Sequence, residues 1–180
     1  MKKTVLTFGL ISGAMMIVMM AATVPFAHKI GFNRALIVGY TTMVAAFLMV
    51  FFGIRSYREN IGDGKISFSK AFAIGILITL ITCICYVAAW EVIYFKFMPD
   101  FMEEYTQQVV EKARAAGATQ QAIDAKVQEM RQFKQMYDKP LINAAMTFTE
   151  PFPVGLLITL ISSLILRRSH KKRGGHGTAS

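Results

Sequence analysis

Two glutamates stand beside or within the most apolar parts of this chain, and they are the side chains best suited to chemistry there. Glu91 lies in the run CYVAAWEVIYF, and Glu150 directly precedes PFPVG. An ionisable group within an apolar segment is costly to bury and often serves an ion, a proton or a substrate. Two such groups at similar depth would suit a cation or proton, so Glu91 and Glu150 form our candidate polar site.

A simpler interpretation of both glutamates stays open. If the third apolar helix begins at Ala71, Glu91 lies ~30 Å further along it, which is about the thickness of the hydrocarbon core. Glu91 would then be an interfacial residue that reaches headgroup water, or pairs with Lys96 or with a neighbouring helix. Counting back from Arg167 places Glu150 ~25 Å away, at a similar depth. The sequence does not show whether the two carboxylates touch.

Pro151 and Pro153 predict a break at the start of the last apolar segment. A proline removes a backbone N–H and disfavours helix in the residue before it. Freed carbonyl groups at membrane depth must face protein or water, so a small polar niche beside Glu150 is one interpretation. The other is that Glu150 ends an interfacial segment and the membrane helix begins at Pro151.

The sequence contains no motif that supports catalysis or metal binding. GDGKIS lacks the spacing of a phosphate-binding loop. Cys83 and Cys85 point ~200° apart on a helix and have no histidine nearby, so we expect buried thiols. The apolar segments contain no Ser/His pairing, H-E-x-x-H or paired-Asp motif. We therefore predict no catalytic residue, cofactor or metal, with an intramembrane enzyme as the disfavoured alternative.

Four uncharged apolar stretches must position the two glutamates. They cover residues 4–27, 35–54, 71–90 and 151–166, and the last becomes long enough when extended back to Leu141. A transmembrane helix needs ~20 apolar residues. We therefore predict an all-α integral membrane bundle of four transmembrane helices, at about 4–27, 35–54, 71–95 and 141–168, so that residues 1–98 contain the first three.

The basic residues follow the pattern of a multi-pass inner-membrane protein. The net charge is +9, and the N-terminus, the second loop and the tail together hold eleven basic and two acidic residues. Cytoplasmic loops carry the excess of Lys and Arg. We therefore place both termini in the cytoplasm of a bacterium and expect the lipid bilayer, not nucleic acid, beside this charge. The inner-side anchor consists of Arg55, Arg58, Arg167, Arg168, Lys171, Lys172 and Arg173.

The sequence pattern of residues 99–140 predicts an αα-hairpin outside the membrane, between the third and fourth transmembrane helices. Apolar residues recur at helical spacing on each side of Gly117, and Thr119 suits an N-cap. The stripes are Phe101, Tyr105, Val109 and Ala113, then Ile123, Val127, Met130 and Tyr137. The two helices would pack on each other and on the membrane domain, or the hairpin would receive a protein partner. Residues 169–180 predict a disordered basic tail.

Gly9 and Gly13 form a G-x-x-x-G pattern in the first apolar helix. Small residues at this spacing let two helices approach closely. The pattern predicts packing within the chain or, as the alternative, contact with a second copy in a homo-oligomer.

Several spaced blocks of the sequence resemble one family. They are FFGIRSYREN, GDGKISFSKAFAIG, YVAAWEVIYFKFMPDF and TFTEPFPVGLLITLISSLILRR, in this order. These blocks are similar to domain-of-unknown-function family 4199, and the resemblance covers nearly the whole chain up to Arg168. It implies a small bacterial inner-membrane protein with four spans and no assigned activity, and it supplies no catalytic residue.

Two functions follow as expectations. The first is a non-enzymatic multi-pass protein whose outer hairpin serves interaction or assembly. The alternative is a small transporter or channel-like subunit that uses Glu91 and Glu150 near the outer face. Because four spans are few for a monomeric carrier, the alternative requires an oligomer.

Overall fold

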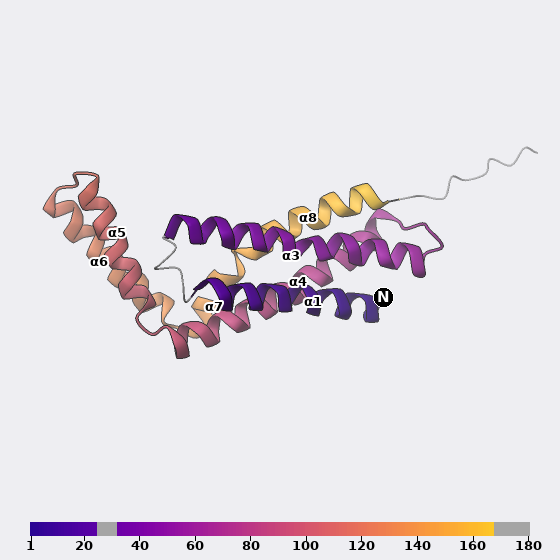
Figure 1. The fold of residues 1–180 in the computed structure, drawn as a ribbon, viewed down its shortest axis with the longest axis horizontal. Helices are drawn as coiled ribbons and strands as arrows, with labels where there is room; N and C mark the ends of the chain where they lie inside the picture. Colours follow the sequence, from indigo (N-terminus) through magenta and orange to yellow (C-terminus); the bar gives the residue numbers. More distant parts are fainter. Residues whose placement is uncertain (25–31, 168–180) are drawn as a thin grey trace, which may run out of the picture. The chain divides into compact units, whose positions relative to one another are not determined.

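The computed structural model describes residues 1–24 and 32–167, and within these ranges it contains helices and no β-strand (Figure 1). The predicted all-α class is therefore confirmed for the described residues. Arg168, Lys171, Lys172, Arg173 and the predicted tail lie outside them. The helices are α1 (Lys2–Thr23), α3 (Phe32–Asn60), α4 (Phe68–Val92), the π-helix η2 (Ile93–Phe97), α5 (Phe101–Ala115), α6 (Gln120–Tyr137), α7 (Pro140–Phe148) and α8 (Pro151–Leu166).

Four helical segments are long and apolar enough to cross a membrane. They are Lys2–Thr23, Ile37–Asn60, Phe68–Phe97 and Pro140–Leu166, with 22, 24, 30 and 27 residues. At 1.5 Å per residue the shortest reaches ~33 Å, which exceeds the ~30 Å hydrocarbon core. The third segment runs from α4 into η2, and the fourth contains α7 and α8. The predicted bundle of four membrane helices is confirmed.

Local sequence explains where several of these helices begin and end. Ser67 Oγ accepts a hydrogen bond from Lys70 N at 3.4 Å before α4, and Thr119 Oγ1 accepts one from Ala122 N at 3.3 Å before α6. Both side chains thus act as N-caps. Between α5 and α6, Gly117 adopts a φ of 77°, a left-handed conformation that glycine reaches without strain.

The chain forms two compact units, which we describe separately. Unit 1 comprises Met1–Thr82 and Phe152–Ser180, and it contains α1, α3, the first part of α4 and α8. Unit 2 comprises Cys83–Pro151, and it contains the end of α4, η2, α5, α6 and α7.

Unit 1 buries small and hydroxyl side chains together with large apolar ones such as Phe47 and Ile78, and it leaves many large aliphatic side chains uncovered. A membrane bundle packs through small residues, while its aliphatic side chains contact lipid tails that are equally apolar. This distribution therefore fits a helix bundle that is surrounded by lipid. Residues covered by the chain include Gly9, Ser12, Gly13, Gly155, Thr159, Ser162 and Ser163. Uncovered residues include Leu6, Leu10, Ile11, Leu157, Ile161 and Ile165.

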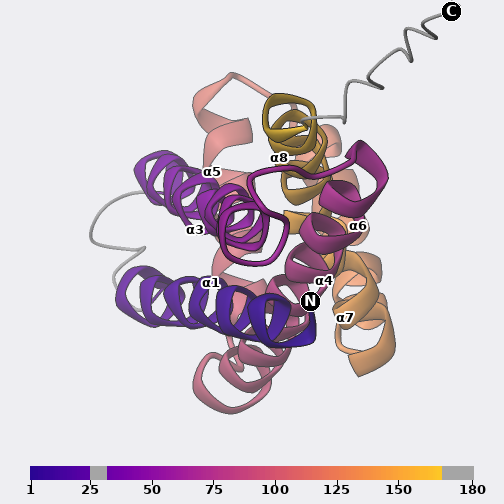
Figure 2. The ribbon, with the colours of Figure 1, turned by 90° about the vertical axis from the view of Figure 1, so that its right-hand side faces the viewer.

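Hydrogen bonds between hydroxyl groups and neighbouring helices link the elements of unit 1. Ser12 Oγ donates to Ala46 O at 2.8 Å and joins α1 to α3. Thr79 Oγ1 lies 3.0 Å from Thr159 Oγ1 and joins α4 to α8. Figure 2 shows α1, α3, α4 and α8 close together when viewed toward their ends. Each such bond in a membrane contributes roughly 0.6 kcal/mol on average.

The G-x-x-x-G residues Gly9 and Gly13 lie on the covered face of α1. A Cβ atom on Gly9 would lie 2.9 Å from Ile81 Cβ of α4, inside van der Waals contact. The absence of a side chain at Gly9 therefore lets α1 approach α4 within unit 1. Contact of this face with a second copy stays a prediction.

In unit 2, α5 and α6 lie side by side and are joined by a turn at Gly117 (Figure 1). Met102 of α5 and both Ile123 and Met130 of α6 are buried. Most of the charged and glutamine side chains of the two helices are exposed. The helix pair therefore covers Met102, Ile123 and Met130 and presents a largely polar surface, on which Met136 is exposed.

Candidate functional site

Glu91 lies in the last turn of α4, directly before the π-helical turn η2. At that turn Met98 N donates to Ile93 O at 2.9 Å, across five residues instead of four. The turn η2 ends at Phe97 and Met98 lies outside the helix, so the π-helical turn terminates the third membrane segment. Wide turns of this kind occur at helix C-termini.

The Glu91 carboxylate has a buried oxygen without a partner. Its Oε1 atom accepts no hydrogen bond from any described residue. The described residues also supply no ion pair to Glu91, and Lys96 is exposed. A buried acceptor left without a donor costs ~1–3 kcal/mol, and more when it is charged. The pairing with Lys96 that we considered from the sequence is therefore not formed.

Glu150 lies in the two-residue turn between α7 and α8. The helix α7 ends at Phe148, and α8 begins at Pro151 with Pro153 in its first turn. The structure thus places the break directly before both prolines, with a further helix ahead of it. Glu150 Oε2 accepts a hydrogen bond from Tyr86 Oη of α4 at 3.0 Å. This bond connects the turn to the third membrane segment within unit 2.

A chain of polar side chains runs from α4 to α7 through Tyr137. Trp90 Nε1 donates to Tyr137 Oη at 2.9 Å. Tyr137 Oη lies 3.4 Å from Thr147 Oγ1, which donates to Asn143 Oδ1 at 3.2 Å. Asn143 is 0% exposed, and its Nδ2 has no partner among the described residues. The chain therefore ends at an unused donor.

Both carboxylates act electrostatically on the Tyr137 hydroxyl. Burial raises the pKa of Tyr137, and the negative charges of Glu150 and Glu91 raise it further, whereas its hydrogen bonds with Thr147 and Trp90 oppose the rise. Among the described residues, no hydrogen bond joins Glu91 to Glu150 or to Tyr137. We call Glu91, Glu150, Tyr137, Trp90, Thr147 and Asn143 the Tyr137 cluster.

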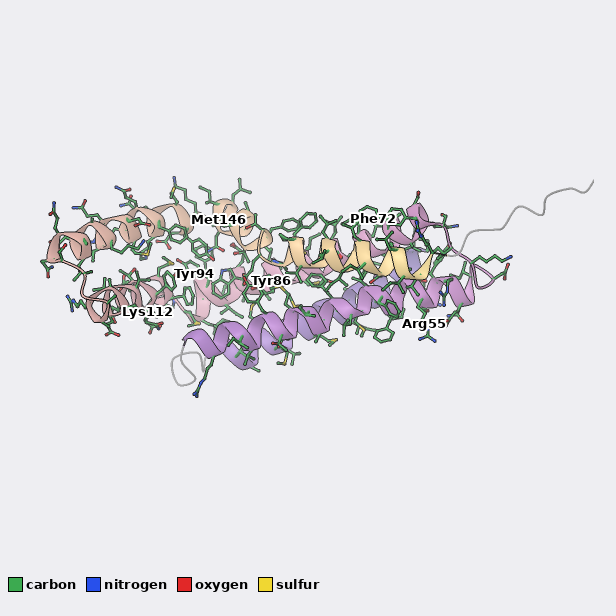
Figure 3. All side chains as sticks on the ribbon, turned by 90° about the horizontal axis from the view of Figure 1, so that it is seen from above. Arg55, Phe72, Tyr86, Tyr94, Lys112 and Met146 are labelled. Atoms are coloured by element: carbon green, nitrogen blue, oxygen red, sulfur yellow. The ribbon has the colours of Figure 1, made fainter. Side chains whose placement is uncertain are left out.

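Beside the Tyr137 cluster, a second set of contacts fixes α6 to the third membrane segment. Tyr94 Oη donates to Asp138 Oδ1 at 2.6 Å, and Lys134 Nζ donates to Asp138 Oδ2 at 3.0 Å. Burial raises the pKa of Asp138, but these two hydrogen bonds and the Lys134 charge outweigh it and hold the pKa below its ordinary value. The Tyr94 and Tyr137 rings pack edge to face, with centroids 5.2 Å apart. Figure 3 labels Tyr94 and Tyr86 in this region.

The sequence profile of the family described as "Protein of unknown function (DUF4199)" matches residues 7–168 of the chain. The chain belongs to this family. The match includes Glu91, Glu150 and the whole helix pair, and it confirms the resemblance of the spaced sequence blocks. No curated protein and no solved structure matches the chain.

In this DUF4199 member, the helix α7 turns its polar side inward. Asn143 and Thr147 are buried, whereas Leu141 is 83% exposed and Met146 is also exposed. Such a distribution is unfavourable in water but suits a helix that faces lipid. Neither these two residues nor Trp90 and Tyr137 were predicted to be members of a site. Their signal was present, because Asn143 and Thr147 stand four residues apart in an apolar segment and so share one helix face.

The donor set of the DUF4199 site consists mainly of oxygen atoms. Its members are carboxylates, hydroxyl groups and one amide, together with the indole N–H of Trp90. The described residues contain no group of three His, Cys, Asp or Glu side chains that could hold a metal ion. Cys83 is a buried free thiol, and Cys85 is also free. The arrangement is therefore suited to hydrogen bonding.

The described part of the predicted inner-side anchor lies at the ends of α3 and α8 in unit 1. Arg55 Nε donates to Glu59 Oε1 at 2.9 Å, and Arg58 Nη2 donates to the same oxygen at 3.3 Å. Arg167 follows α8 and is exposed.

Proposed function

We propose that this protein is a non-enzymatic, multi-pass protein of the bacterial inner membrane that serves interaction or assembly through α5 and α6. Both termini would lie in the cytoplasm. The anchoring of the helix pair supports this proposal, with the 2.6 Å hydrogen bond from Tyr94 to Asp138 as its main observation. Ordering a backbone costs ~1–2 kcal/mol per residue. Because fixing the backbone is costly, a segment that only connected two membrane helices would not need to be held in one conformation by such contacts.

The exposed surface of the helix pair fits a polar protein partner. Residues 96–140 hold seven basic and seven acidic residues. Some pair locally, as in the 2.8 Å ion pair between Lys126 and Glu129. A surface of mixed charge offers no continuous positive field for nucleic acid. It would instead select a partner by complementary charges and hydrogen bonds.

Site-specific crosslinking in intact cells tests this proposal. A photo-crosslinking residue at Gln121 or Gln128, both exposed on α6, should yield a crosslinked product of discrete mass. The same residue at Leu157, which is exposed on α8, serves as the control and should yield none because it faces lipid. Absence of a product from both α6 positions would exclude docking on this surface, as would an equal product from Leu157.

The Tyr137 cluster favours a second candidate function, an oligomeric small transporter or channel-like subunit that uses Glu91 and Glu150. The supporting observation is that two buried polar atoms, Glu91 Oε1 and Asn143 Nδ2, have no hydrogen-bond partner among the described residues. In reconstituted vesicles, the double variant Glu91→Gln, Glu150→Gln should abolish flux without reducing expression. Glu111→Gln, on the exposed surface of α5, should leave the flux unchanged. A flux that survives the double variant would rule this candidate out.

A further inference from the structure

Three helices of unit 1 meet at Gly75 of α4. A Cβ atom on Gly75 would lie 2.8 Å from Thr159 Cγ2 of α8 and 3.1 Å from Ile54 Cδ1 of α3. One turn earlier in α8, a Cβ atom on Gly155 would lie 2.5 Å from Thr79 Cγ2, which is one turn later in α4. The helices α4 and α8 are therefore antiparallel, and these contacts fix their register.

The next layer of the three helices, toward the end of α8, contains Arg58, Ala71 and Ser163. Each is four residues from the member of the Gly75 contact on its own helix, so it lies on the same helix face ~6 Å further on. Lys70 Nζ of α4 lies 5.4 Å from the centre of the Tyr57 ring of α3, so the end of α3 meets the start of α4 at this level. Side chains from α3 and α8 therefore enter one layer.

Two polar atoms of this layer have no hydrogen-bond partner among the described residues. They are Nε of Arg58 and Oγ of Ser163, and both atoms are buried. Nη2 of Arg58 donates to Glu59 Oε1 at 3.3 Å, an oxygen that also accepts from Arg55 Nε at 2.9 Å. All eleven Asp and Glu residues of the chain lie in the described ranges, so no other carboxylate side chain serves the two free atoms.

The side chains around this layer are mainly basic. Residues 55–70 contain four basic and two acidic side chains, and Arg167 follows Ser163 by one helical turn. Lys70 and Arg167 are exposed. Arg55, which is labelled in Figure 3, marks this end of unit 1. An excess of positive charge attracts anions to the layer.

The layer lies near the ends of two membrane segments. Arg58 precedes the last residue of Ile37–Asn60 by two positions, and Ser163 precedes the last residue of Pro140–Leu166 by three. Both are therefore ~3–5 Å from the segment ends, where the hydrocarbon core gives way to the lipid headgroups. Basic pockets between membrane helices at this depth can bind phosphate-bearing headgroups.

We propose that Arg58 and Ser163 bind a phosphate group between the ends of α3 and α8. A phosphate has several acceptor oxygens, so it can accept hydrogen bonds from the guanidinium and the hydroxyl group together. Lys70 and Arg167 would add attraction through their charges. The phosphate would belong to the headgroup of an anionic phospholipid or be free in the aqueous phase. The site lies within unit 1, and it does not depend on either proposed function.

Binding to the full-length protein in uncharged detergent tests this site and identifies the source of the phosphate. Native mass spectrometry would follow titrations with phosphatidylglycerol, which is anionic, and with phosphatidylcholine, which has no net charge. Calorimetric titration with inorganic phosphate, without lipid, is the second arm. A lower Kd for phosphatidylglycerol than for phosphatidylcholine would assign the site to a lipid headgroup. Saturable binding of inorganic phosphate would assign it to a free phosphate.

Four variants test the assignment in whichever arm shows binding. Arg58→Gln should raise the Kd ~10-fold, the scale of one hydrogen bond to a charged group, and Ser163→Ala should raise it ~3-fold. Arg58→Lys keeps the charge without the Nε–H and should give an intermediate Kd. Arg55→Gln removes the same charge from an exposed position of the same helix and should change the Kd less than about 2-fold. Circular dichroism checks that each variant keeps its helices.

Three results would overturn the phosphate site. The first is equal retention of the two lipids together with no binding of inorganic phosphate. The second is equal weakening by Arg55→Gln and Arg58→Gln, which would show a general charge effect in place of a site. The third is an unchanged Kd in Ser163→Ala, because the hydroxyl would then take no part in binding.

Discussion

At the scale of single residues, the Tyr137 hydroxyl connects the polar groups of unit 2. It accepts a hydrogen bond from Trp90, lies 3.4 Å from Thr147 and is affected by the charges of Glu91 and Glu150. Each residue was visible in the sequence, but Trp90 and Tyr137 are 47 positions apart. Contacts of that range depend on how the helices pack, so helical periodicity could not predict them. The sequence could only place the two glutamates at similar depth.

Removal of the Tyr137 hydroxyl should destabilise the protein. Tyr137→Phe leaves the indole N–H of Trp90 without its acceptor at a part-buried position, which should cost ~0.5–1.5 kcal/mol, the net contribution of a typical hydrogen bond. Denaturant-induced unfolding in detergent measures this loss. Tyr40→Phe, on the exposed side of α3, is the control and should change stability by less than about 0.5 kcal/mol. Equal effects of the two variants would contradict the role of the hydroxyl.

Asp138 should make the stability of unit 2 depend on pH in the acid range. Hydrogen bonds from Tyr94 and Lys134 hold its folded-state pKa below the unfolded value. Its contribution is therefore complete above the unfolded pKa and is lost as pH falls through the folded pKa. Wild type should be more stable than Asp138→Asn at pH 7, and the difference should shrink below about pH 4. A difference that stays constant from neutral to acid pH would contradict this linkage.

At the scale of elements, sequence and structure agree most closely where local rules decide. Apolar runs of sufficient length gave the four membrane helices, and Thr119 and Gly117 marked the turn between α5 and α6. The π-helical turn η2 and the separate helix α7 were not predicted. The five residues of η2 are too few to show a period of their own, whereas Asn143 and Thr147 did mark one face of α7. The positions beside the candidate site were thus the hardest to predict.

Replacing a glycine of unit 1 by alanine should destabilise the helix packing at one position and be tolerated at another. A Cβ atom on Gly155 would lie 2.5 Å from Thr79 Cγ2 and 2.7 Å from Phe47 Cε1. Gly155→Ala should therefore cost ~1–3 kcal/mol through overpacking. Gly39 of α3 has nothing within 4 Å of such a Cβ atom, so Gly39→Ala should be neutral or slightly stabilising. Thermal unfolding in detergent compares the two variants, and equal unfolding midpoints would contradict the close packing at Gly155.

At the scale of the whole molecule, the chain is a member of the DUF4199 family with four helices fit to cross a membrane. Three of these helices separate the N-terminus from the pair α5–α6, and the fourth separates that pair from the C-terminus. If all four cross, the pair lies on one side of the membrane and both termini lie on the other. The excess of basic residues in the terminal segments and the second loop is the basis of our proposal that the termini lie in the cytoplasm.

Cysteine accessibility in intact cells tests this topology most directly. In a background with Cys83→Ala and Cys85→Ala, Gln120→Cys lies on α6 and Gly175→Cys lies near the C-terminus. A membrane-impermeant maleimide should label Gln120→Cys in intact cells, and should label Gly175→Cys only after permeabilisation. Labelling of both positions in intact cells, or protection of Gln120→Cys until permeabilisation, would contradict the four-span topology.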